Sequence, residues 1–127
     1  MNNDKILIVE NNQIILDTFK NCFNAEEIKN VDFASSAEEA IEKMDLNQYS
    51  KIIAEYKMSD SIDIFSEAKN RNIGERIMIT ASARCPINST EATCGFRKPL
   101  TMRSIRQICL EDKECIDSLL KIMHHSA

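Results

Sequence analysis

The protein has 127 residues, enough for one compact domain with its own hydrophobic core. Its composition, 43% hydrophobic and 28% charged, is that of a soluble globular protein, and its apolar runs are only a few residues long, so we expect no membrane span and no signal peptide. The net charge of −4 and the scattered basic residues provide no positive field for binding a phosphate backbone, which argues against a nucleic-acid partner.

The first elements follow the pattern of a buried strand leading into a helix. Lys5–Val9 is a short apolar, β-branched run that ends at polar residues, as a buried parallel strand does. Apolar residues then recur at helical spacing over Gln13–Asn24, and either Asn11 or Asn12 can cap the start of this helix.

The same pattern repeats along the chain. Val31–Ala34 predicts a second strand, and Ser35 or Ser36, followed by acidic residues, predicts the start of a helix that runs to Leu46. The expected later elements are strands at Lys51–Glu55, Arg76–Thr80 and Thr93–Phe96, a helix from about Ser61 to Asn70 and a last helix from about Thr101.

A fourth helix is poorly supported between the last two predicted strands. Pro86, Asn88, Ser89 and Thr90 crowd the segment where it should lie, so we expect it to be weak or shortened. The five strands still alternate with helices, which predicts an α/β fold: right-handed crossovers and a doubly wound parallel sheet covered on both faces.

Polar side chains follow or end four of these strands. In doubly wound sheets the ligand site lies beyond the carboxyl ends of the strands. The residues that we expect to gather there are Glu10, Asn11, Glu55, Thr80 and Lys98.

The order and spacing of several motifs carry a family resemblance. They are Ile6–Val9 before a polar pair, the Ile-Ile-x-acid run ending at Glu55 with Met58 three residues on, Ile79–Ala81, and Phe96–Leu100. From Lys5 to about Cys109 the chain resembles the receiver domain of two-component response regulators (CheY-like). The resemblance implies a flavodoxin-like (βα)5 fold with strand order 2-1-3-4-5.

The resemblance also implies roles for the gathered residues. In receivers, two acidic residues after strand one and an acceptor aspartate after strand three hold magnesium, and a hydroxyl and a lysine contact the phosphoryl oxygens. By this match Glu10 and Asn11 form the acidic pocket, Glu55 stands at the phosphoacceptor position, and Thr80 and Lys98 are the phosphate contacts.

The chain departs from the family at the residues that phosphorylation needs. Asn11 is neutral, and Glu10 and Glu55 are one methylene longer than aspartate, so any magnesium site at Glu10 and Glu55 is expected to be weak, and no cofactor is expected to be required. Gly95 stands where receivers place a switch aromatic residue, and Phe96 is expected to point to the opposite face.

These departures predict a pseudo-receiver that signals by protein–protein interaction rather than catalysis. Glu55 would partly mimic a phosphorylated acceptor beside Lys98 and Thr80. The protein is expected to be cytoplasmic, and its expected partner is a histidine kinase, phosphotransfer protein or output protein. Three alternatives stay open. They are a working phosphorelay receiver with an unusual acceptor, a doubly wound domain that binds a small molecule, and a Glu55 that is only an ordinary strand-end carboxylate.

The C-terminal segment extends past what a receiver needs. We divide the chain into a receiver-like domain, residues 1–110, and a helical extension, residues 111–127. Apolar residues from Ile105 to Met123 alternate at spacings of four and three with one polar interruption. The extended helix is therefore expected either to pack on the core or to serve as a dimerisation or partner-binding helix, with a homodimer as one outcome.

The cysteines and histidines predict no metal or disulfide framework. Five cysteines without a CxxC pair fit a reducing cytoplasm, and His124 and His125 are interpreted as a solvated tail.

Overall fold

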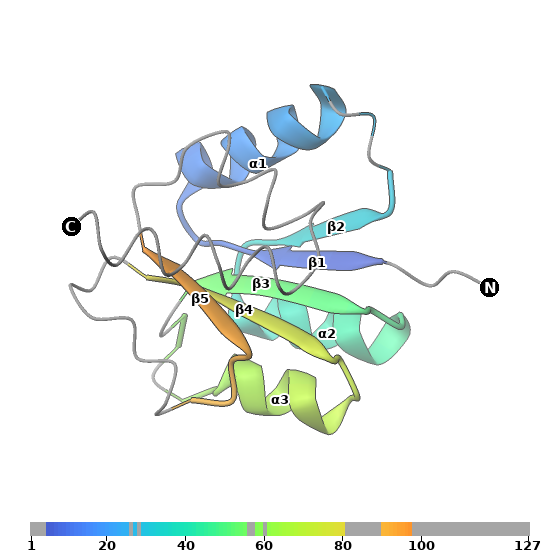
Figure 1. Ribbon diagram of the computed structural model, residues 1–127, viewed down its shortest axis with the longest axis vertical. Coiled ribbons are helices and arrows are strands. Elements are labelled where there is room, and N and C mark those ends of the chain that lie inside the picture. The colour runs from blue at the N-terminus through green and yellow to red at the C-terminus, as the bar shows by residue number, and fades with distance from the viewer. Residues whose placement is uncertain are drawn as a thin grey trace.

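The computed structural model describes residues 5–25, 27, 29–55, 58–59, 61–80 and 90–97. In these residues the chain forms a parallel five-stranded sheet with the order β2-β1-β3-β4-β5 (Figure 1). The strands are β1 (Ile6–Val9), β2 (Val31–Ala34), β3 (Lys51–Glu55), β4 (Glu75–Thr80) and β5 (Cys94–Arg97). The predicted doubly wound sheet and its strand order are confirmed.

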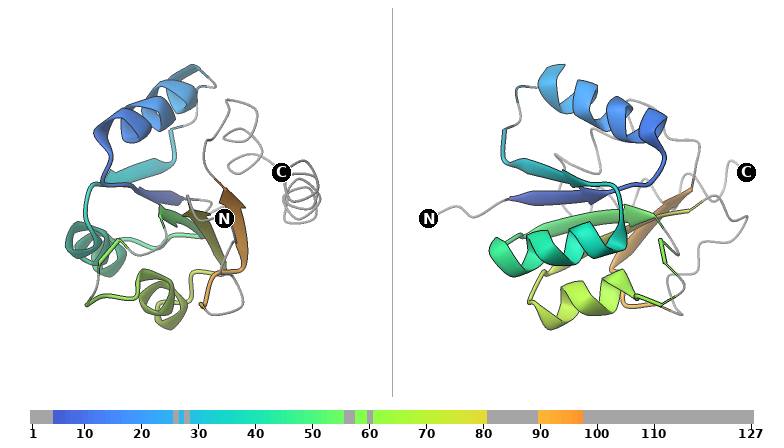
Figure 2. Two further views of the ribbon diagram at one scale, coloured as in Figure 1. Left: turned by 90° about the vertical axis from the view of Figure 1, so that its left-hand side faces the viewer. Right: turned by 180° about the vertical axis from the view of Figure 1, so that it is seen from behind.

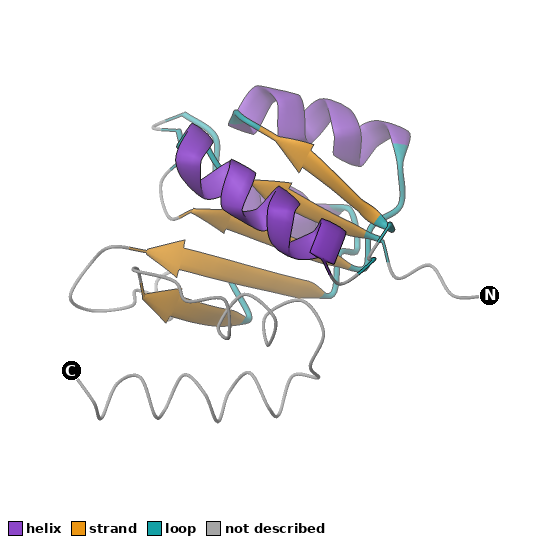
Figure 3. Ribbon diagram, turned by 90° about the horizontal axis from the view of Figure 1, so that it is seen from above, coloured by secondary structure: helices purple, strands orange, loops and turns teal. Residues whose placement is uncertain are grey.

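Three described helices cover the two faces of the sheet. α1 (Gln13–Ala25) lies on one face, and α2 (Ala37–Leu46) and α3 (Ile64–Asn70) lie on the other (Figure 2). The strand arrows all point the same way, so the carboxyl ends of the strands share one edge (Figure 3). This edge is where a doubly wound sheet places its site.

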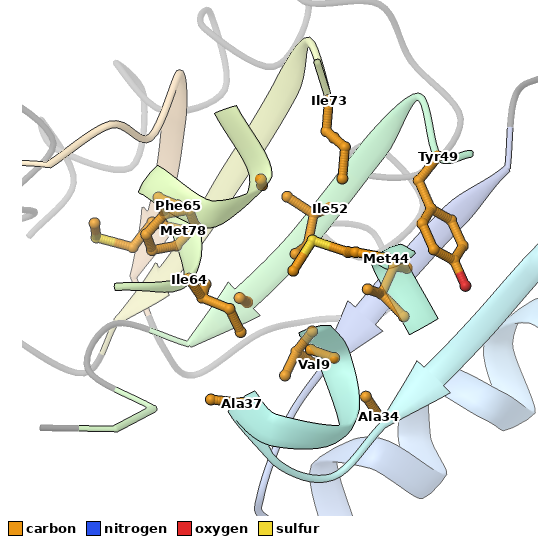
Figure 4. Packing of buried hydrophobic residues seen from close by; sticks show 14 residues of the cluster. Val9, Ala34, Ala37, Met44, Tyr49, Ile52, Ile64, Phe65, Ile73 and Met78 are labelled. Atoms are coloured by element: carbon orange, nitrogen blue, oxygen red, sulfur yellow. The ribbon is translucent and has the colours of Figure 1, made fainter. Parts of the chain in front are cut away.

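Successive side chains of each strand point to opposite faces of the sheet, which divides the core into two apolar layers. Ile8 of β1 packs in the layer under α1, and its neighbour Leu7 packs in the layer under α2 and α3. Both side chains are fully buried. Figure 4 shows the second layer, in which Met44 and Ile52 lie near Tyr49 at one end and Phe65 packs beside Met78 at the other.

The cap residues of the first two helices were among the predicted candidates. For α1 the cap is Asn12, whose Oδ1 accepts hydrogen bonds from the backbone N–H groups of Ile14 (2.9 Å) and Ile15 (3.3 Å). For α2 it is Ser36, whose Oγ accepts from the N–H of Glu39 at 3.1 Å. The Glu39 carboxylate accepts from the N–H of Ser35 at 2.8 Å, so the return bond of the predicted capping-box-like start is made to the residue before the cap.

The predicted start of α3 was wrong by three residues. The helix begins at Ile64 instead of Ser61, because Asp63 is its cap and accepts from the N–H groups of Phe65 (3.1 Å) and Ser66 (3.2 Å). Ser61 and Ile62 instead donate their N–H groups to Ser59 Oγ, which holds them in a loop.

Other boundaries move by one residue. β1 begins at Ile6 rather than Lys5, β4 begins at Glu75, and β5 spans Cys94–Arg97 instead of Thr93–Phe96. Thr93 precedes β5 because its N–H and Oγ both bond to the carbonyl of Arg76, which brings the chain alongside β4. The segment of the weak fourth helix, the last helix and the extension at 111–127 lie outside the described residues.

Candidate functional site

Three of the predicted site residues lie together at the carboxyl edge of the sheet. Glu10 follows Val9 of β1 as Glu55 follows Ala54 of β3, and Val9 and Ala54 are register partners. Adjacent strands are about 5 Å apart, so Glu10 and Glu55 lie side by side at the ends of neighbouring strands. Glu55 pairs in turn with Ile79, and Thr80 is the next residue of β4.

The two acidic positions differ in exposure. Glu10 is 2% exposed, whereas Glu55 at the end of β3 is partly exposed. A carboxylate at the open end of a strand is accessible to solvent and to ligands, and a buried one depends on the protein for its hydrogen bonds. Glu55 is therefore the more solvent-accessible of the two acidic side chains.

Glu10 and the two residues after it form a short hydrogen-bonded loop. The N–H of Glu10 donates to the carbonyl of Ala34 at 3.0 Å, which extends the β1–β2 ladder by one residue. Its Oε2 accepts the N–H of Asn12 at 3.1 Å. Asn11, between them, is exposed. The predicted neutral member of the acidic pocket is thus on the surface, and the acidic member is turned into its own loop.

Thr80 and Gly95 lie on the next two strands. Thr80 is 2% exposed and pairs with Arg97 of β5, so the hydroxyl ends its strand inside the structure. Gly95 is a buried residue of β5 and pairs with Met78. It provides no side chain at the position that was predicted to correspond to the switch aromatic. Lys98, the predicted lysine contact, lies outside the described residues.

The described ranges contain no group of three or more His, Cys, Asp and Glu side chains that could hold a metal ion. Within the same ranges, no helix has the length and apolar character that crossing a bilayer requires.

Comparison with known proteins gives structural but not sequence matches. No family model matches the chain, and no curated protein matches it. A CheY-like response regulator receiver domain protein from Methanospirillum hungatei has a TM-score of 0.71 and 22% identity, over 99% of this chain and all of that one. A response regulator from Burkholderia pseudomallei, with a phosphorylated aspartic acid, a calcium ion and citrate, has a TM-score of 0.73 and 12% identity, over 98% of this chain and 75% of that one.

A third similar structure is the signal receiver domain of an HD domain-containing protein from Pseudomonas fluorescens. It has a TM-score of 0.70 and 15% identity, over 99% of this chain and 100% of that one. The chain has the receiver fold. Because the sequence identities are low, the matches establish the architecture alone, and any function must be argued from the side chains at the carboxyl edge.

The contact between Glu10 and the loop was not predicted from the sequence. Glu10 was expected to be a pocket residue, but the structure shows that its carboxylate also organises the entry into α1. The available signal was the spacing, because a side-chain acceptor two residues before an N–H group can fold back onto it, as in turns made by Asn and Asp.

Proposed function

We propose that this protein is a signal-transduction module with the receiver fold that acts by protein–protein recognition without phosphorylation. Glu55 partly takes the place of a phosphorylated acceptor. The observation that carries the proposal is the position of Glu55 at the end of β3, between the strand ends that carry Glu10 and Thr80.

The length of the Glu55 side chain favours mimicking a phosphorylated acceptor over accepting a phosphoryl group. Glu55 extends its carboxylate one methylene farther than aspartate, about 1.5 Å, which disturbs the in-line geometry that phosphoryl transfer needs. The same extension brings negative charge into part of the volume that an aspartyl phosphate would fill. A carboxylate carries one negative charge and a phosphate nearly two, so the mimicry is partial.

The groups that would read this charge follow neighbouring strands. Thr80 ends β4, which is the strand next to β3, and its hydroxyl can donate to an oxygen anion. Lys98 directly follows β5 in the sequence, and its ammonium is the expected cation. A Glu55–Lys98 contact would hold the module in one state, with no phosphoryl group needed to stabilise it.

The expected partner is another signalling protein: a histidine kinase, a phosphotransfer protein or an output protein. The similar receiver domain from Pseudomonas fluorescens belongs to an HD domain-containing protein, which supports a role in passing a state to another domain.

A phosphotransfer assay tests the central claim. The protein is incubated with acetyl phosphate and magnesium, and its intact mass is measured. We expect no stable gain of about 80 Da, the mass of one phosphoryl group, on the natural chain. A stable adduct located on Glu55 would overturn the proposal and favour a working receiver with an unusual acceptor. Glu55→Asp in the same assay measures whether the shorter acceptor restores transfer.

The mimicry has a separate test. Glu55→Gln and Lys98→Met are combined in a double-mutant cycle, and the free energy of unfolding is measured by urea titration. A direct contact predicts that the two effects are non-additive by about 1 kcal/mol. Additive effects would remove the Glu55–Lys98 contact from the proposal, whatever the phosphotransfer assay shows.

A further inference from the structure

The residues that follow β1 show how the start of α1 is held. The backbone of Glu10 is fixed by the Ala34 carbonyl, its carboxylate accepts the N–H of Asn12, and the Asn12 side chain accepts the N–H groups of Ile14 and Ile15. Each side chain in this relay satisfies backbone donors that would otherwise have no helical partner. The relay therefore runs without interruption from the sheet edge into the first turn of the helix.

We propose that Glu10 is a positioning residue that anchors the β1–α1 loop and is not a ligand for a divalent cation. The receiver fold implies a metal at this edge, but the donors described here do not fit one. Asn11 is neutral and exposed, and no group of three acidic, thiol or imidazole side chains is formed by the residues whose placement is described. Magnesium prefers several well-placed oxygen ligands in octahedral geometry.

Burial supports the anchoring role. Magnesium keeps several of its waters when a protein binds it, so a ligand carboxylate needs open space for a hydrated ion. Glu10 is only 2% exposed, and one of its oxygens already accepts a loop N–H. Removing this acceptor would leave the Asn12 N–H without its carboxylate, which opens the loop.

The inference gives Glu10 and Asn12 the task that a cation performs in a metal-dependent loop. They pre-organise the entry into α1, next to the strand end that carries Glu55, at any concentration of divalent ions. The claim concerns the β1–α1 loop alone and does not depend on whether Glu55 mimics a phosphoryl group.

Amide hydrogen exchange of the full chain, followed by NMR, tests the anchor. Glu10→Ala is expected to raise the exchange rate of the Asn12 amide about tenfold, the effect of losing one charge-assisted hydrogen bond. Glu10→Gln keeps an acceptor oxygen and is expected to stay within about threefold of the natural chain. Glu42→Gln, an exposed charge change on α2, is the matched control and should leave this amide unchanged.

A cation titration of the natural chain completes the test and remains informative if Glu10→Ala fails to fold. Magnesium and calcium, each added to about 10 mM, are expected to leave the amide signals of residues 10–15 unshifted. This concentration is high enough to detect a weak site, because the weakest natural calcium sites are half-filled near 1 mM. Saturable shifts at Glu10 and Glu55 would overturn the proposal. So would an Asn12 amide whose exchange does not respond to Glu10→Ala.

Discussion

The hydroxyl of Tyr49 donates a 2.6 Å hydrogen bond to Oδ2 of Asp32 across β1, at the edge of the sheet opposite the candidate site. The Nζ of Lys5 lies 3.2 Å from the same oxygen and donates to Oδ1 of Asn47, also at 3.2 Å. We call Lys5, Asp32, Asn47 and Tyr49 the amino-edge cluster. It joins the start of β1, β2 and the segment before β3, and its Tyr49 ring is buried in the core (Figure 4).

Tyr49→Phe is expected to lower the free energy of unfolding by about 1–2 kcal/mol. The substitution keeps the buried ring and removes one hydrogen bond to a charged acceptor, which has a net value of this order. Urea titration of the two proteins measures the difference. A double-mutant cycle with Asp32→Ala is the control: the two effects should be non-additive, and simple additivity would contradict a direct contribution from the hydrogen bond.

The amino-edge cluster should make stability depend on pH at both extremes. Burial alone would raise the pKa of Asp32, but hydrogen bonds from Tyr49 and Lys5 and the charge of Lys5 outweigh it and hold that pKa below the ordinary 3.8. Burial, together with the hydrogen bond to Asp32, raises the pKa of Tyr49 well above the ordinary 10.0.

The directions of the two pKa shifts define the pH range over which the amino-edge cluster stabilises the fold. A lowered Asp32 pKa stabilises the fold above about pH 4, and the contribution is lost as pH falls through the folded-state value. A raised Tyr49 pKa stabilises it below about pH 10, and the contribution is lost as pH rises toward the folded-state value. The stability difference between the natural chain and Tyr49→Phe should be constant near neutral pH and shrink at both ends. A difference that is the same at every pH would count against this account.

Asn72 is expected to tolerate glycine but not valine. It has a φ of 63° after the end of α3, where its N–H donates to the Lys69 carbonyl and the N–H of buried Ile73 donates to the Ala68 carbonyl, both at 3.0 Å. Asn72→Gly should change stability by less than about 0.5 kcal/mol, and Asn72→Val should cost about 1–2 kcal/mol. Asn70→Val, at the exposed helical end of α3, is the matched control and should cost less than about 0.5 kcal/mol. Equal losses for the two valine variants would show that the left-handed backbone is unimportant.

Asp63→Ala should destabilise the start of α3 by about 1 kcal/mol, because its carboxylate caps two N–H groups. Asp63→Asn keeps an acceptor and should retain most of the stability. Chemical denaturation measures the global effect, and amide exchange at Phe65 and Ser66 locates it. Unchanged exchange at these two amides in Asp63→Ala would rule out the cap as the cause of any loss.

Helix starts were predictable where the candidate cap residues were few and adjacent. Ser36 and Asn12 were each one of two adjacent candidates, so the boundary could not move far. For α3, several polar residues precede the first buried turn, and the choice of Asp63 depends on which of them the core allows to face the N–H groups of Phe65 and Ser66. That choice is made by the burial of Ile64 and Phe65 against the sheet.

The amino-acid pattern alone was enough to predict the alternation of strands and helices, the parallel sheet and the edge at which Glu10, Glu55 and Thr80 meet. These features follow from the spacing at which apolar residues recur, from strand length and from the geometry of crossovers. All three are local or topological properties that a single chain encodes directly. Three features could be seen only in the folded chain: the direction of the Glu10 carboxylate, the hydrogen bond from Tyr49 to Asp32 and the cap of α3. These depend on which donors and acceptors packing brings within hydrogen-bonding distance, and in the Tyr49–Asp32 pair the partners are 17 residues apart in the chain.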